Sequence, residues 1–184
     1  MKKQPPTDPR KRKGLIIVNT GDGKGKSTAS FGLALRAAGN KMNVFIMQFM
    51  KGPWKAGERK ALKGISSYVK YEAMGDGFTW DTNNPEQDKK TARDAFDIAK
   101  EKIMSGKYQM VILDEINYVL DYQFFPLEEF LETLKTKPKD VHVVCSGRNA
   151  NEKLIEMADL VTEMKLIKHP YDDQGIPAQK GIEF

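Results

Sequence analysis

The sequence predicts an α/β fold of the P-loop NTPase-like (RecA-like) kind, with a mostly parallel sheet covered by helices on both faces. Three observations predict it. Short, continuous apolar runs alternate with helical patterns along the chain, which is typical of parallel strands joined by helices. A glycine-rich turn ending in Lys26-Ser27 stands between the first predicted strand and the first predicted helix. A later apolar run ends in two acids, Asp114 and Glu115.

The predicted strands and helices follow from these apolar patterns. Runs typical of buried strands lie at 14–19, 44–47, 67–73, 110–113, 141–145 and 160–164. Helical patterns lie at 27–38, from 85 to about 105, at 127–135 and at 151–158. The clearest boundary is the start of the helix from 85 to about 105. Asn84 has the chemistry of an N-cap, with Pro85 at the first helical position and Gln87 at the capping-box position.

Two stretches carry no such pattern. Residues 51–64 are rich in glycine and contain a proline, and we predict a loop there. Residues 168–184 are either a disordered end or a functional loop, because glycine and proline interrupt them and no periodicity is visible.

Length and composition fit one globular domain. The chain has 184 residues, 40% of them apolar and 30% charged, and no run approaches the roughly 18 apolar residues of a membrane span. Its single cysteine, Cys145, excludes a disulfide framework and a cysteine-based metal cluster. The N-terminus is basic but no apolar stretch follows it, so we expect no secretory signal, no membrane partner and a cytoplasmic location.

The net charge of +5 belongs to one end of the chain. Residues 1–13 hold six basic residues and one acid, and the remaining residues are balanced. We predict a flexible basic segment at 1–13 and a single domain at 14–184. This segment either keeps the protein soluble or has a binding role, in which it folds over an anionic ligand or binds nucleic acid. Because the body is neutral, we expect no nucleic-acid partner.

The strongest chemical signal is residues 20–27, TGDGKGKS. They match the P-loop template G-x-x-x-x-G-K-[ST], except that Thr20 stands at the first glycine. Backbone N–H groups of such a loop converge on phosphate oxygens, and the following helix adds its dipole. Lys26 supplies a positive charge, and the Ser27 hydroxyl can bind a divalent metal. The residues expected to contact the nucleotide are Gly21, Asp22, Gly23, Lys24, Gly25, Lys26, Ser27 and Thr28.

The run 110–113 followed by Asp114 and Glu115 is the Walker B pattern of P-loop proteins. In a parallel sheet its carboxyl end lies beside the phosphate loop, so one carboxylate can reach a metal there. The two motifs together predict a nucleoside triphosphate with Mg²⁺ or Mn²⁺. They do not say which bond of the nucleotide breaks.

Groups for covalent catalysis are few. Cys145 lies in an apolar strand and is predicted to be a packed residue rather than a nucleophile, and no Ser-His-Asp set is visible. An enzyme whose nucleophile belongs to its substrate fits this pattern. Phe78 and Trp80 lie in a polar, glycine-rich stretch, where they are either a lid for a flat apolar ligand or part of the core.

Eight segments in order make a specific resemblance to a known family. They are TGDGKGKS at 20–27, QFMKG at 48–52, GDGFTW at 75–80, LDEINY at 113–118, SGRN at 146–149, ADLVTE at 158–163, KHP at 168–170 and the stretch 175–183. Together they resemble the P-loop type of ATP:corrinoid adenosyltransferase, over residues 14–184. The threonine at the first P-loop position is that family's own pattern. Ser27 replaces a more usual threonine, and Asp22 replaces an asparagine.

The resemblance implies a reaction and roles. A Co(I) corrinoid attacks the 5′ carbon of ATP and expels triphosphate, in the synthesis or salvage of adenosylcobalamin. ATP would lie reversed relative to ordinary P-loop NTPases, so that the ribose faces the attacker. Lys24 and Lys26 would hold the triphosphate, with Lys26 counted among the catalytic residues. Ser27 and Glu115 would bind the metal, with Glu115 favoured over Asp114.

The resemblance also implies roles for aromatic residues and partners. Phe78 and Trp80 would crowd the lower face of the corrin, which excludes its lower axial ligand and eases reduction to Co(I). A reduced flavoprotein would donate the electron, and the N-terminal segment would cover the site of a partner subunit in a homodimer. Whether cobalamin or a precursor is the acceptor stays open. The rival functions are a P-loop ATPase or kinase acting on a terminal phosphate, and a nucleotide-dependent nucleic-acid-binding protein.

Overall fold

The protein, represented by a computed structural model, is described here at residues 13–50, 57–65, 67–75 and 84–183. Six strands form one sheet in the order β3-β2-β4-β5-β1-β6, and every neighbouring pair is parallel. The strands are β1 (Ile16–Thr20), β2 (Val44–Gln48), β3 (Val69–Ala73), β4 (Met110–Asp114), β5 (His142–Ser146) and β6 (Leu160–Glu163). All six fall within the predicted apolar runs or extend them by one residue at an end.

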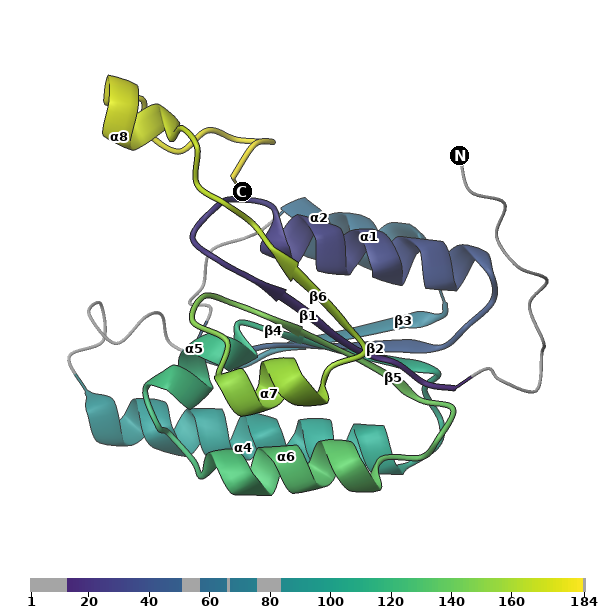
Figure 1. The fold of residues 1–184 in the computed structure, drawn as a ribbon. Coiled ribbons are helices and arrows are strands. Elements are labelled where there is room, and N and C mark those ends of the chain that lie inside the picture. Colours follow the sequence, from purple (N-terminus) through teal and green to yellow (C-terminus); the bar gives the residue numbers. More distant parts are fainter. Residues whose placement is uncertain (1–12, 51–56, 66, 76–83, 184) are drawn as a thin grey trace, which may run out of the picture.

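Helices cover both faces of the sheet (Figure 1). On one face lie α1 (Lys26–Gly39) and α2 (Gly57–Ile65). On the other lie α4 (Pro85–Met104), α5 (Ile116–Asp121), α6 (Leu127–Thr136) and α7 (Glu152–Met157). A short helix, α8 (Pro170–Gln174), lies beyond the sheet. The prediction of an α/β, P-loop NTPase-like fold is confirmed.

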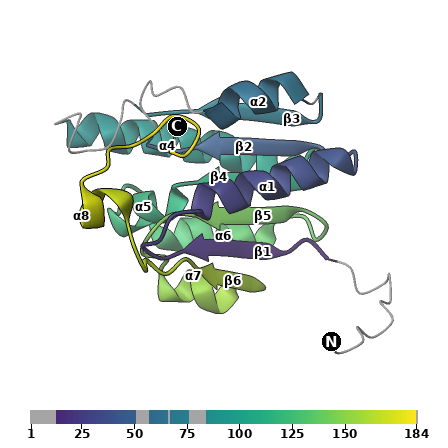
Figure 2. The same cartoon turned by 90° about the horizontal axis from the view of Figure 1, so that it is seen from above.

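The carboxyl ends of all six strands lie at one edge of the sheet, because the strands are parallel (Figure 2). Because β1, β2 and β4 are buried at all five positions, their side chains divide between two apolar clusters, one under α1 and α2 and one over α4 and α6. The turn before α1, the turn before α5 and the segment around α8 all lie at the carboxyl edge. This edge is where ligands bind in open α/β sheets.

The N-terminus of α4 forms as predicted, with one difference. The Asn84 side chain accepts a hydrogen bond from the Gln87 backbone N–H at 3.3 Å, and Pro85 occupies the first turn. The Gln87 side chain instead donates to the Thr91 hydroxyl at 3.3 Å. The cap is therefore one-sided rather than a reciprocal capping box.

Three helices of the described part were not predicted from the sequence: α2, α5 and the five-residue α8, which lies in the stretch 168–184 predicted as a disordered end or a functional loop. Residues 57–65 form α2, whereas a loop was predicted over 51–64; residues 51–56 lie outside the described part. Leu62 of α2 is 5% exposed and joins the cluster under α1, so packing outweighs the helix-breaking tendency of glycine at this helix's ends. The six-residue helix α5 is too short for its periodicity to show in the sequence. Among the described residues, no helix is long and apolar enough to cross a membrane.

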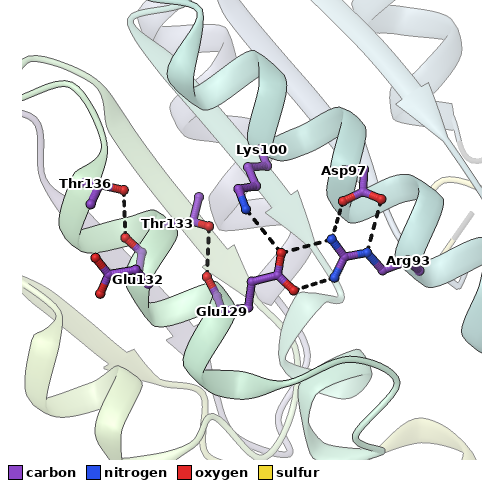
Figure 3. Close-up of polar contacts among 7 residues, drawn as sticks. All are labelled: Arg93, Asp97, Lys100, Glu129, Glu132, Thr133 and Thr136. Carbon is purple, nitrogen blue, oxygen red and sulfur yellow. Dashed lines mark hydrogen bonds and ion pairs between the residues drawn. The ribbon is translucent and has the colours of Figure 1, made fainter.

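An ion-pair network joins α4 to α6 (Figure 3). The Arg93 guanidinium of α4 donates to Asp97 on its own helix and to both carboxylate oxygens of Glu129 on α6, at 2.5 and 2.9 Å. Lys100 reaches the same carboxylate at 3.2 Å. The hydrogen bond from Arg93 lowers the pKa of Glu129 to about 2. This network lies on the face opposite α1 and holds two helices of that layer together.

Candidate active site

The phosphate loop joins β1 to α1 and is pinned to the end of β6. The Gly23 N–H donates to the Met164 carbonyl at 2.7 Å, and the Met164 N–H donates to the Thr20 carbonyl at 2.8 Å. Gly21 and Gly25 have φ values of 93° and 111°, a region that favours glycine. A Cβ on Gly23 would stand 2.7 Å from the Met164 carbonyl oxygen. The glycines therefore allow both the turn and its close approach to β6.

Lys26 places its charge at the centre of this loop. Its side chain is buried, and its ammonium donates to the carbonyls of Gly21 at 2.7 Å and Gly23 at 2.8 Å. Burial lowers the pKa of Lys26, and the nearby carboxylate of Glu115 acts in the opposite direction. The ammonium thus lies among the loop amides that the sequence assigns to phosphate.

Distant segments of the chain meet the loop at its two other charged side chains. Lys24 is exposed and forms an ion pair with Glu183 of the C-terminal segment. Asp22 is also exposed, and its carboxylate lies 3.8 Å from Arg148 Nε in the turn after β5. At the start of α1, Ser27 is half-buried and Thr28 is exposed. Asp22 therefore lies close to a protein cation rather than adding an isolated negative charge to the loop.

The two acids after β4 differ in environment. Asp114 has no exposed surface, and its carboxylate accepts hydrogen bonds from Gln48 Nε2 and Ser146 Oγ, each at 2.5 Å. Gln48 in turn accepts a hydrogen bond from the Tyr71 hydroxyl. This network ties the carboxyl ends of β2, β4 and β5 to the middle of β3, so Asp114 points into protein rather than into the loop.

Glu115 lies on the side of the phosphate loop. Its φ of 65° is left-handed, which turns the chain sharply between β4 and α5. Its backbone N–H donates to Ser146 Oγ at 3.4 Å, and its carboxylate is near enough to Lys26 to oppose the lowering of that ammonium's pKa by burial. A Cβ on Gly147 would stand 3.3 Å from Glu115 Oε2, and the φ of Gly147 is 130°. The turn after β5 thus leaves room for this carboxylate.

Asn117 adds a buried acceptor beside the same turn. Its side chain is 1% exposed, and Nδ2 donates to the Gly147 carbonyl at 3.0 Å. Its Oδ1 has no hydrogen-bond partner among the described residues. Because Gly147 presents a carbonyl, the amide orientation is set, and the orphaned oxygen needs a donor such as a ligand or a water molecule.

Of the remaining sequence candidates, Cys145 lies in the described part of the chain, and Phe78 and Trp80 do not. Cys145 is fully buried in β5, and burial raises the pKa of its thiol to about 12, so it is a packed residue as predicted. Phe78 and Trp80 lie outside the described residues. Sequence reasoning assigned no role to Gln48, Ser146, Asn117, Arg148 or Glu183. All five lie in segments that carry the family resemblance, at 48–52, 113–118, 146–149 and 175–183, and four of them also end or follow a strand at the carboxyl edge.

Comparison with known proteins points to one family. Residues 12–184 match the family described as ATP:corrinoid adenosyltransferase BtuR/CobO/CobP. The chain belongs to this family. Adenosyltransferases are thus similar to it over nearly the whole described fold, phosphate loop and C-terminal segment included.

Several named family members are similar in sequence. A corrinoid adenosyltransferase of Sinorhizobium sp is 49% identical over 94% of this chain and 81% of its own length. The Escherichia coli (strain K12) corrinoid adenosyltransferase is 41% identical, over 94% and 86%. The Salmonella typhimurium corrinoid adenosyltransferase CobA is 39% identical, over 95% and 88%. As a member of the family, the protein is an enzyme that transfers an adenosyl group from ATP to a corrinoid.

Proposed function

We propose that the phosphate loop holds the triphosphate of ATP so that the ribose 5′ carbon faces the cobalt of a Co(I) corrinoid. The observation that carries this proposal is the Lys26 ammonium, buried among the loop carbonyls of Gly21 and Gly23 at the carboxyl edge of the sheet. Loop amides and this charge suit a polyphosphate. No observation on the described residues favours the rival ATPase or kinase.

The protein's tasks in this reaction are positioning and charge stabilisation. The cobalt electron pair forms the bond to C5′, the C5′–O bond breaks, and triphosphate leaves with the bonding electrons. Since the nucleophile belongs to the corrinoid, the chain need not supply one. Its loop amides, Lys24 and Lys26 stabilise the negative charge that grows on the departing oxygen and hold the sugar in line.

We also propose that Ser27 and Glu115 bind Mg²⁺ or Mn²⁺. Both side chains offer the hard oxygen ligands that these ions prefer. The space kept by Gly147 beside Glu115 and the orphaned Asn117 oxygen suit a hydrated ion. Among the described residues no group of three or more His, Cys, Asp or Glu side chains could hold a metal, so phosphate oxygens and water would complete the coordination. When bound, the ion offsets the charge of the triphosphate.

Replacing Lys26 tests the phosphate role. Hydrogen bonds to charged groups contribute about 1.5–3 kcal/mol, so we expect Lys26→Ala to weaken ATP binding roughly 10- to 150-fold in calorimetric titrations. Lys135→Ala, which removes an exposed lysine from α6, is the matched control and should bind ATP as the wild type does. An unchanged ATP affinity and turnover in Lys26→Ala would remove the phosphate loop from the mechanism.

We propose further that Phe78 and Trp80 crowd the lower corrin face, as the family resemblance implies. Truncating either residue should then slow turnover that begins from Co(II) more than turnover that begins from chemically reduced Co(I). An equal loss in the two assays would contradict this role.

The family resemblance also supports a homodimer, a reduced flavoprotein as electron donor and a cytoplasmic location. The start of the described chain is held near β6, because Lys13 pairs with Asp159 and the Ile16 N–H donates to the same carboxylate at 2.9 Å. We propose that residues 1–12 reach a partner subunit from there. Deleting residues 2–12 should weaken corrinoid binding in a dimeric protein. Unchanged corrinoid and ATP binding would leave those residues a solubilising tail.

A further inference from the structure

We infer that Asp114 is a positioning residue that acts through Ser146 to hold Glu115 toward the phosphate loop, and that Asp114 is not itself a metal ligand. Asp114 ends β4 at the position where the Walker B pattern expects a carboxylate to reach the metal. The inference rests on the proposed metal role of Glu115, and it assigns the two neighbouring acids different tasks.

The contacts of Asp114 keep it away from the loop. Both of its carboxylate oxygens accept hydrogen bonds from buried donors, Gln48 Nε2 and Ser146 Oγ, and it has no exposed surface. Turning Asp114 toward a metal would break both bonds and leave two buried donors unpaired, which is costly. The contacts therefore favour a fixed, inward-facing carboxylate.

Ser146 passes this orientation on to Glu115. A hydroxyl can donate one hydrogen bond, and Ser146 Oγ donates it to Asp114 Oδ1 at 2.5 Å. Its lone pairs then remain to face the Glu115 N–H, 3.4 Å away. The accepting oxygen of Asp114 thus makes Ser146 an acceptor toward the residue that bears the second carboxylate.

Glu115 needs such support because its backbone is left-handed, with φ 65°, a conformation unfavourable for residues with a side chain. The neighbouring turn adds to the support. Gly147 has φ 130° and approaches Asn117 so closely that a Cβ would lie 3.0 Å from the Asn117 Cβ. The turns after β4 and β5 therefore fix each other, and Ser146 stands between them.

The test measures how strongly Mg²⁺ enhances ATP binding in three variants, by calorimetric titration of ATP across a range of Mg²⁺ concentrations. Glu115→Gln should weaken the apparent Mg²⁺ affinity at least tenfold. Ser146→Ala should weaken it about tenfold, as expected for a residue that orients a metal ligand. Asp114→Asn should change it less than about threefold, because the new amide can still accept from Ser146 while the Gln48 amide reverses. ATP binding without Mg²⁺, measured for each variant, separates a change in the phosphate contacts from a change in Mg²⁺ affinity.

Thr133→Ala is the control for loss of a buried hydroxyl, since Thr133 is 3% exposed and donates to the Glu129 carbonyl at 2.9 Å in α6. It should lower the melting temperature and leave the Mg²⁺ dependence unchanged. A Ser146→Ala protein that behaves like this control would overturn the positioning role. Asp114→Asn with a loss as large as that of Glu115→Gln would show Asp114 to be a ligand, and it decides the question even where Ser146→Ala does not fold. A wild-type Mg²⁺ dependence in Glu115→Gln would instead refute the proposed metal site.

Discussion

The ion pair between Lys24 and Glu183 predicts that removing the Glu183 carboxylate tightens binding of the triphosphate. Lys24 belongs to the phosphate loop, and in the described part of the chain its ammonium pairs with this carboxylate from the C-terminal segment. A carboxylate and a phosphate oxygen compete for the same ammonium protons. Glu183→Gln keeps the shape of the side chain and removes the competing charge.

The expected change is modest, because the Lys24 side chain is 60% exposed. Exposed ion pairs contribute about 0.2–1 kcal/mol, so the variant should bind triphosphate roughly 1.5- to fivefold more tightly. The Lys24 hydrogen bond lowers the pKa of Glu183. The carboxylate therefore competes at neutral pH and stops competing only as the pH falls below the usual range of glutamate, where wild type and variant should converge.

Isothermal titration of inorganic triphosphate and of ATP with Mg²⁺ measures the effect. Glu156→Gln, which removes an exposed carboxylate of α7, is the matched control for net charge and should bind as the wild type does. Added salt should shrink the difference between Glu183→Gln and wild type. Weaker binding by Glu183→Gln would mean that the carboxylate orders Lys24 for phosphate, and an affinity equal to that of the control would mean that it does not compete.

Three further predictions concern the phosphate loop, helix α1 and the ion pair between α4 and α6. Gly23→Ala should lower both the melting temperature and ATP affinity, the latter at least tenfold, because its Cβ would collide with the Met164 carbonyl at 2.7 Å. Gly32→Ala, whose Cβ meets nothing within 4 Å in α1, should instead stabilise the protein by about 0.5–1 kcal/mol; the opposite order in thermal unfolding would refute this. Glu129→Gln should lower the free energy of unfolding by about 1 kcal/mol at pH 7, measured by denaturant unfolding. This is less than the pKa of about 2 alone implies, since the side chains of Arg93 and Glu129 are 36% and 30% exposed. Because that pKa lies below the ordinary value near 4.5, the contribution is present above pH 4.5 and disappears as the pH falls toward 2; a cost that persists at pH 2 would contradict it.

The sequence was most informative where burial imposes a simple pattern. The strands buried on both faces, such as β2 and β4, are continuous apolar runs, and the phosphate loop has a fixed spacing between a strand and a helix. The helix α4 carries its own start signal at Asn84. The helix α2 carries no such signal. It forms because Leu62 packs under α1, which stabilises the helix more than its local sequence does.

The site could be predicted only in its contiguous parts. Lys26 and Glu115 lie in recognisable motifs, and the structure brings their charges close together. Contacts between remote residues leave no local pattern, so the Lys24–Glu183 pair and the hydrogen bond from Ser146 to Asp114 were not predictable from spacing. The different environments of Asp114 and Glu115 arise from the partners that the sheet brings beside them.

The most direct test of the account is the fate of the three phosphates during a single turnover. ³¹P NMR of a reaction containing the protein, ATP, Mg²⁺ and a Co(I) corrinoid should show one new species, inorganic triphosphate, in an amount equal to the cobalt–carbon bond formed. Appearance of ADP and orthophosphate in proportion to turnover would mean that phosphorus, not the sugar carbon, is attacked in this loop.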